Sequence, residues 1–125
     1  MPGQADKEST MKIDTCWQDL RSSPVLMEGA RGAVKRLVQG PADGTPHMAL
    51  RVFTIEPGGF TPLHSHPFEH QNLVLEGQGV IRSAKGDHPI APGSMALILP
   101  GEQHQFLNTG AGPLSFVCLV PNEYA

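Results

Sequence analysis

Glycine and proline interrupt this sequence at short intervals along its whole length. There are fourteen glycines and twelve prolines among 125 residues, which exceeds the average share of both. They recur along the chain instead of forming one low-complexity block. Apolar and β-branched runs between such breaks are typical of short strands joined by tight turns. The pattern therefore predicts an all-β fold.

The runs between these breaks define the expected strands. We expect strands over 32–40, 47–59, 70–79, 95–99, 104–107 and 112–121, a hairpin around Lys85-Gly86-Asp87, and an edge strand or helical turn within 11–28. The second of these strands should end at Pro57-Gly58-Gly59. The total is about eight to ten short strands, which would be antiparallel and form a sandwich or a barrel. The apolar run Met95–Leu99 predicts a strand covered on both faces, with a homodimer partner as the second cover.

Length and charge exclude several classes of protein. A chain of 125 residues has the size of one domain. Its net charge of −3 argues against a nucleic-acid partner, which requires a basic surface. No apolar run approaches the length that spans a membrane, and the N-terminus has no apolar signal-peptide core. We therefore expect a cytoplasmic protein, with Cys16 and Cys118 as free thiols and a single disulfide between them as the alternative.

Four histidines stand out by their arrangement. His64 and His66 are two residues apart, so their side chains share one face of an extended chain. Pro67 bends the chain before His70, and a returning strand can bring that imidazole to the same point. His104 follows at another turn-to-strand junction. Buried imidazoles need partners, and a divalent transition metal bound by all four would satisfy them. His47 and His88, each beside a turn, are expected on the surface.

The spacing of these histidines resembles the first conserved motif of the cupin superfamily. That motif reads Gly, five residues, His, one residue, His, three or four residues, Glu, six residues, Gly. Here Gly58, His64, His66 and Gly77 take the corresponding positions, and His70 stands where the family usually has glutamate.

The second cupin motif is also present, fifteen residues after the first. It reads Gly, five residues, Pro, one residue, Gly, two residues, His, three residues, Asn. The glycines, the histidine and the asparagine of this motif are matched by Gly93, Gly101, His104 and Asn108. The proline position is occupied by Leu99, and Pro100 follows it. The match covers residues 58–108 closely, and the flanking strands agree only in pattern.

The resemblance implies a fold and a set of ligands. It implies a single cupin β jelly-roll barrel over residues 11–125, and the polar residues 1–10 before it are expected to form a disordered tail. It also implies a metal near the barrel centre, with His64, His66 and His104 as three of the ligands.

The fourth ligand departs from the usual pattern. Small cupins with the segment HxHxxEH resemble this chain most, and their site has four histidines. Strand alternation also favours His70 over its neighbour Glu69, with Gln71 as a further alternative. Four neutral imidazoles would leave the ion its full positive charge. Imidazole suits Zn, Cu, Fe and Ni, and the family also uses Mn.

The remaining candidates concern a substrate pocket. Its candidate residues are Arg51, Phe53, Phe60, Phe68, Met95 and Phe106. If Arg51 faces the barrel it would bind a substrate carboxylate; the simpler alternative is that it points outward. No catalytic base is evident outside the metal ligands, since nothing in the sequence supports Glu69 or Tyr124 in that role.

Two functions follow from these residues. The first is an enzyme acting on a small organic molecule, with dioxygenase-like, isomerase or lyase chemistry at the metal. The second is a non-catalytic module that binds or senses a small molecule or a metal. Fold membership does not decide between them.

Overall fold

The computed structural model describes residues 11–125, and the tail expected to be disordered, residues 1–10, lies outside the described residues. The elements in chain order are η1 (Trp17–Asp19), β1 (Ser23–Pro24), β2 (Arg31–Gln39), η2 (Pro41–Asp43), β3 (Met48–Phe60), β4 (His70–Glu76), β5 (Gly79–Ser83), β6 (Gly86–Ile90), β7 (Met95–Ile98), β8 (His104–Asn108), β9 (Leu114–Pro121) and η3 (Asn122–Tyr124). The three η elements are short 3-10 turns. The all-β prediction is therefore confirmed.

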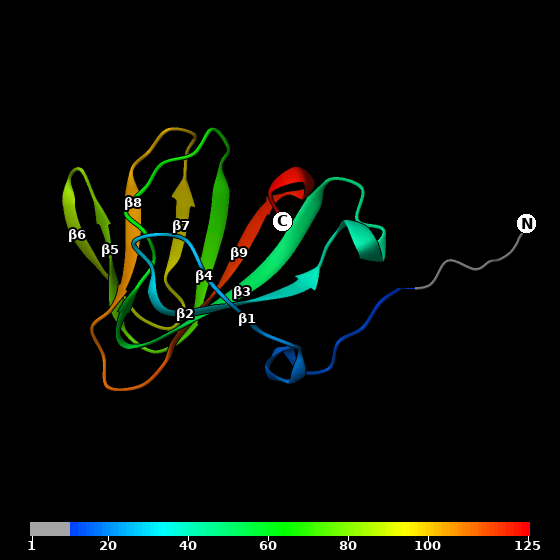
Figure 1. The fold of residues 1–125 in the computed structure, drawn as a ribbon, viewed down its shortest axis with the longest axis horizontal. Helices are drawn as coiled ribbons and strands as arrows, with labels where there is room; N and C mark the ends of the chain where they lie inside the picture. Colours follow the sequence, from blue (N-terminus) through cyan, green and yellow to red (C-terminus); the bar gives the residue numbers. More distant parts are fainter. Residues whose placement is uncertain (1–10) are drawn as a thin grey trace, which may run out of the picture.

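Nine strands form one curled antiparallel sheet (Figure 1). The order is β6-β5-β8-β3-β9-β4-β7, with β2 also paired to β3 and β1 to β2. The long strand β3 pairs with β9 over Met48–Ile55 and with β8 only at Phe60. It therefore joins the two halves of the sheet, and its curvature closes them around one interior, as in a β-barrel.

The expected end of β3 at Pro57-Gly58-Gly59 is wrong, because the strand continues to Phe60. Pairing with β2 passes from Ala33 opposite Ile55 to Arg31 opposite Phe60. Four residues of β3, 56–59, therefore lie opposite the single residue Gly32 of β2 and form a bulge. A bulge tolerates proline, which cannot donate to the ladder, and glycine with a positive φ angle.

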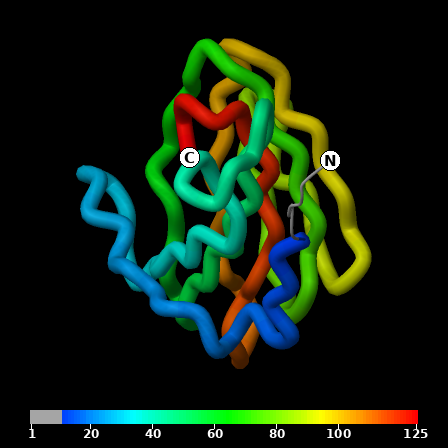
Figure 2. Tube along the Cα trace, turned by 90° about the vertical axis from the view of Figure 1, so that its right-hand side faces the viewer, coloured from blue at the N-terminus to red at the C-terminus, as the bar shows by residue number. Residues whose placement is uncertain are grey.

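The first described residues and the C-terminal turn both contact β2 or the segment that follows it. Figure 2 shows the C-terminal turn in red beside the segment that joins β2 to β3. Thr45 and Asn122 are joined there by two hydrogen bonds, of 2.6 Å each. At the other terminus, Lys12 donates to Val38 O and Arg36 donates to Leu20 O, which holds the first segment along β2.

The core lies inside the curl of the sheet. Ile55, Leu114, Phe116 and Phe106 are at most 3% exposed and come from β3, β9 and β8. They pack in one cluster with Val74 of β4. Because strand residues alternate in direction, the neighbours of these core residues face outward.

The outer face of β7 differs from the expectation for its apolar run. Ile98 is 6% exposed, but Met95 is 81% exposed and Leu97 is 54% exposed. Within one chain, this strand is therefore covered on one face only. The homodimer that would cover the other face stays a prediction.

Two smaller expectations concern the cysteines and the membrane. Cys16 and Cys118 are free thiols, as expected. Among residues 11–125, no helix has the length and apolar character needed to cross a bilayer. The cytoplasmic location stays a prediction.

Candidate metal centre

Backbone pairing places His64 opposite His104. The segment after β3 runs beside β8, where Thr61 N donates to Phe106 O at 2.9 Å. His64 and His104 then form an isolated antiparallel bridge, with N···O distances of 3.1 and 2.9 Å in the two directions. Residues directly opposite in such a bridge project to the same side. Their ring centroids are 5.0 Å apart.

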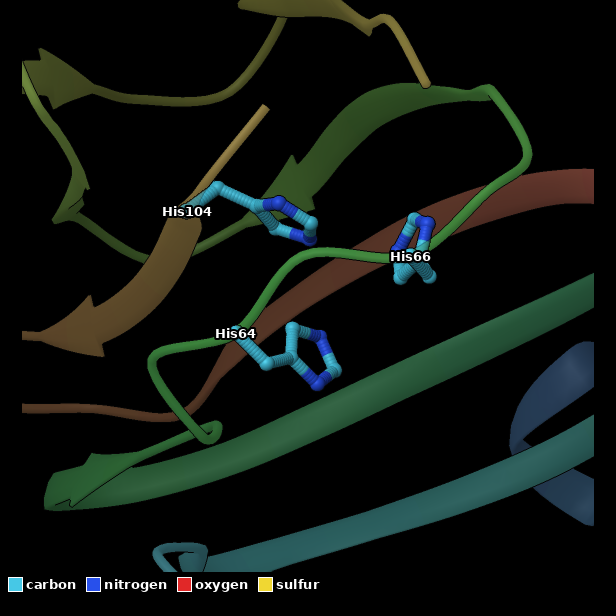
Figure 3. Close-up of side chains that lie close together, drawn as sticks. All are labelled: His64, His66 and His104. Carbon is cyan, nitrogen blue, oxygen red and sulfur yellow. The ribbon is translucent and has the colours of Figure 1, made fainter. Parts of the chain in front are cut away.

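His66 completes a group of three. Its ring centroid lies 5.2 Å from that of His64 and 4.9 Å from that of His104. Each of the three residues offers a ring nitrogen, and these atoms all lie within 4.8 Å of one another. Figure 3 shows the three imidazoles gathered around one space, two from the segment between β3 and β4 and one from the start of β8. This group could hold a metal ion.

His70, the first residue of β4, lies beside this group. Its Nε2 atom is 3.1 Å from Nε2 of His104, and its ring centroid is 5.0 Å from that of His66. His70 is buried, whereas the alternative ligands Glu69 and Gln71 are exposed. The structure thus brings all four predicted histidines together, although His70 is not in the mutually close trio. The surface positions expected for His47 and His88 are confirmed.

Hydrogen bonds at Nδ1 determine which nitrogen of each ring faces the group. Nδ1 of His66 lies 2.9 Å from Phe68 O, and Nδ1 of His104 lies 2.8 Å from Glu102 O. A carbonyl oxygen only accepts, so both Nδ1 atoms carry the proton. Their Nε2 atoms therefore keep a free lone pair. Such contacts are the usual way in which proteins orient histidine ligands.

His70 has the same tautomer for a related reason. Its Nδ1 lies 2.8 Å from Oδ1 of Asn72, whose Nδ2 donates to Val117 O at 3.2 Å. The asparagine amide is thus oriented with its oxygen toward His70, and Nδ1 of His70 is the donor. Two lone pairs, on Nε2 of His70 and of His104, then face each other at 3.1 Å. Two imidazoles on a tetrahedral zinc ion, with bonds of 2.0–2.1 Å, would place their nitrogens about 3.3 Å apart.

The cluster is also electrostatically suited to a cation. Burial, followed by the neighbouring His104, lowers the pKa of His70 to about 3. Burial is likewise the main cause that lowers the pKa of His64 and of His104. These imidazoles are therefore neutral near pH 7, and a metal would not have to displace protons from them.

The metal-free protein is expected to lose stability as the pH falls from about 7 to about 4. In the unfolded chain the pKa values of His64, His70 and His104 return to about 6.5. Below that pH the unfolded state binds protons that the folded state does not, so the free energy of unfolding decreases. For His70 this loss continues down to its folded pKa of about 3. Urea unfolding in the presence of a chelator, at several pH values, measures the effect.

A matched variant separates the histidine contribution from that of the carboxylates. His70→Gln should show a shallower loss of stability with acid than the wild-type chain, because glutamine does not titrate. Equal slopes for the two proteins would contradict the low pKa of His70.

The histidines form one wall of a cavity of about 410 Å³. Of the predicted pocket residues, Arg51, Phe53, Phe68 and Phe106 line it. The inward position of Arg51 contradicts the simpler expectation that it points outward. The direction of Arg51 depends on which alternate residues of β3 face inward. Arg51 has apolar residues on both sides in the sequence, so the sequence does not show which set this is.

Phe60 and Met95 were wrongly assigned to the pocket, since neither lines the cavity. Phe60 pairs with Leu107, which is next to the inward-facing Phe106 and therefore points the other way. Met95 lies on the exposed outer face of β7.

Sequence reasoning missed part of the aromatic lining. Phe116 of β9 and Tyr124 of η3 both line the cavity. Tyr124 stacks on Phe68 with ring centroids 3.8 Å apart, and Phe68 stacks on His66 at 3.9 Å. The alternation of β9 could have indicated Phe116. No local pattern places the C-terminal turn at the cavity, because its position follows from contacts with distant segments.

The four histidines lie within a segment that matches a known family. Residues 51–120 match the family described as Cupin domain. The oxalate-binding protein of Thermotoga maritima is 30% identical over 98 residues, which are 75% of this chain and 80% of that protein.

A second curated relative is longer than this chain. The 1-methylthio-D-xylulose 5-phosphate methylsulfurylase of Rhodospirillum rubrum is 31% identical over 74 residues, which are 59% of this chain. The match spans about half of that relative's length, 47%.

A solved structure agrees over most of the chain. The polyketide cyclase RemF from Streptomyces resistomycificus superimposes with a TM-score of 0.82 and 27% sequence identity, and the match covers 89% of this chain and 80% of that one.

Proposed function

The chain belongs to the cupin domain family, and from this membership we propose that it is a metal-dependent enzyme acting on a small organic molecule at a mononuclear four-histidine centre. The main support is the 3.1 Å separation of the Nε2 atoms of His70 and His104. Both rings donate from Nδ1 to other acceptors. Two free lone pairs at this distance repel each other unless a cation lies between them.

The cavity contains few groups other than the histidines that could perform chemistry. A divalent ion of Mn, Fe, Zn, Ni or Cu would act as a Lewis acid on a ligand oxygen, and Fe, Mn or Cu would add redox chemistry. Among the described residues that line the cavity there is no carboxylate side chain. A general base would therefore come from the metal shell, from the ligand, or from Cys118 or Tyr124, which also line the cavity. The aromatic walls keep water away from the bound molecule and strengthen electrostatic contacts in the cavity.

The reaction class we propose is dioxygenase-like, isomerase or lyase chemistry. Relatives with enzyme names, the methylsulfurylase and the polyketide cyclase, support an enzyme. Imidazoles are the only ligands in the site, so the ion keeps its full charge and polarises a bound oxygen strongly.

The alternative function is a non-catalytic module that binds a small molecule or a metal. The absence of an Asp or Glu side chain from the described cavity lining favours it, and one relative is named as an oxalate-binding protein. A binder and an enzyme would differ in turnover but not in metal content.

Elemental analysis of the protein, purified without a histidine tag or added metal, tests the proposal. We expect close to one divalent transition metal per chain. Iron, manganese or copper would direct the search to oxygen uptake with candidate substrates. Zinc or nickel would direct it to isomerase, lyase or binding roles.

The outcome that contradicts the proposal is equally clear. If the protein binds no metal even after incubation with a panel of divalent ions, the four-histidine centre is not a metal site. Stabilisation by ligands without any turnover, in a metal-loaded protein, would favour the binding module.

A further inference from the structure

Arg51 lines the same cavity as the histidines and is connected to them through the sheet. In the register of β4, β9 and β3, Asn72 lies opposite Cys118, and Cys118 lies opposite Arg51. Asn72 also accepts from His70 at 2.8 Å. Neighbouring strands are about 4.8 Å apart, so the backbones of Asn72 and Arg51 are about 10 Å apart. A small molecule can reach from one to the other.

The guanidinium group of Arg51 has only weak partners. Nη2 donates to the sulfur of Cys118 at 3.0 Å, and Nη1 donates to the carbonyl oxygen of Tyr124 at 3.4 Å. Its carbon CZ lies 4.9 Å from the centroid of the Phe53 ring. Nε is buried and has no hydrogen-bond partner among the described residues. Sulfur is a weak acceptor, so the group is poorly satisfied.

The charge of Arg51 is also not neutralised. Within residues 11–125, none of the ion pairs includes Arg51, and no Asp or Glu side chain lines the cavity. Burial raises the pKa of the Cys118 thiol, which therefore stays neutral and does not act as a counter-ion. A second cation, Lys35, lies nearby. The pKa of Lys35 is lowered mainly by burial and secondly by the charge of Arg51. A partly buried cation without an anion is costly, and a bound anion would remove that cost.

The remaining walls of the cavity are aromatic. Phe116 stacks on Phe106 with centroids 4.1 Å apart and on Phe53 at 5.6 Å. The Phe68–Tyr124 stack lines the same cavity. Sites of this size that combine apolar walls with a few polar groups bind small apolar molecules by their polar ends.

We propose that Arg51 binds the carboxylate of the ligand, so that the cavity selects a small organic acid with an aromatic or apolar body and directs another part of that acid to the histidines. The contact between the acid and the histidines rests on the proposed metal function, whereas the contact between its carboxylate and Arg51 does not. Cys118 helps to position the guanidinium group, because its sulfur accepts from Nη2 of Arg51 at 3.0 Å.

Matched acids and amides test this proposal. Benzoate, phenylacetate and their amides, benzamide and phenylacetamide, are each titrated into the protein by calorimetry at constant salt. Each titration is done with zinc-loaded and with metal-free protein. We expect each acid to bind at least tenfold more tightly than its amide. Arg51→Gln should weaken the acids at least tenfold and leave the amides unchanged. Arg21→Gln, a change at an exposed arginine, is the control and should behave as wild type.

Folding and metal content are measured on the same samples. Arg51→Gln removes a poorly paired cation, so it is expected to fold and to keep its metal. If the acids do not bind, if acids and amides bind equally, or if Arg51→Gln keeps the preference, the proposal is overturned. A protein that binds no zinc but still prefers acids through Arg51 would overturn the metal function alone.

Discussion

His104→Ala is expected to abolish stoichiometric metal binding while the sheet still forms. His104 is close to all three other histidines. Its ring centroid lies 5.0 Å from that of His64 and 4.9 Å from those of His66 and His70. Loss of an orienting contact alone costs a site about 10–100-fold in affinity, and loss of a ligand should cost at least about 100-fold. The metal-to-protein ratio after dialysis measures the loss, and circular dichroism verifies folding.

The matched control is His47→Ala, since His47 is exposed and outside the cavity. This variant should keep the wild-type metal content. Full occupancy in His104→Ala, or in the parallel variant His66→Ala, would show that the ion is not bound by this cluster.

The same series assigns the fourth ligand. His70→Ala should lower metal occupancy more than Glu69→Ala or Gln71→Ala, because His70 is buried beside His104 whereas the other two side chains are exposed. A larger loss in Glu69→Ala would instead give the site three histidines and one carboxylate, as in the usual cupin motif.

Gly77→Ala is expected to be one of the most destabilising single substitutions, lowering the free energy of unfolding by about 3 kcal/mol. Gly77 has a φ angle of +86°, and an added Cβ would overlap the carbonyl oxygen of Pro113 and lie 2.7 Å from Cα of Leu114. Both neighbours are backbone atoms of the chain around β9, so they cannot move without disturbing the sheet. Equilibrium unfolding in urea measures the change.

Gly93→Ala is the matched control. Its φ angle of +93° is similar, but an added Cβ would meet nothing within 4 Å. The cost should therefore be limited to the backbone conformation, about 1 kcal/mol. Equal losses in the two variants would mean that the close approach at Gly77 relaxes freely.

Much of the histidine cluster was predictable because its signals are local. His64 and His66 share a face through the period of two of an extended chain. His70 was favoured over Glu69 by the same alternation, and the exposed position of Glu69 agrees with that preference. The backbone bridge between His64 and His104 was not visible in the spacing, because 39 intervening residues had to fold first.

The sequence by itself determined the class of fold, the approximate strands and the four histidines. The strands and the pairing of His64 with His66 follow from turn formation and alternation between near neighbours in the chain, whereas His104 was recognised by the spacing of the second cupin motif. It placed Phe60 and Met95 wrongly, because bulges and strand phase decide which way such side chains point.

Only the tertiary structure decided what lies opposite the histidines. Arg51 and Cys118 are 67 residues apart in the chain, and their contact exists because β3 and β9 pair in one particular register. Tyr124 reaches the cavity only because η3 is hydrogen-bonded to the segment between β2 and β3. Pairing between distant strands is set by the packing of the whole core, so a local pattern carries no information about it.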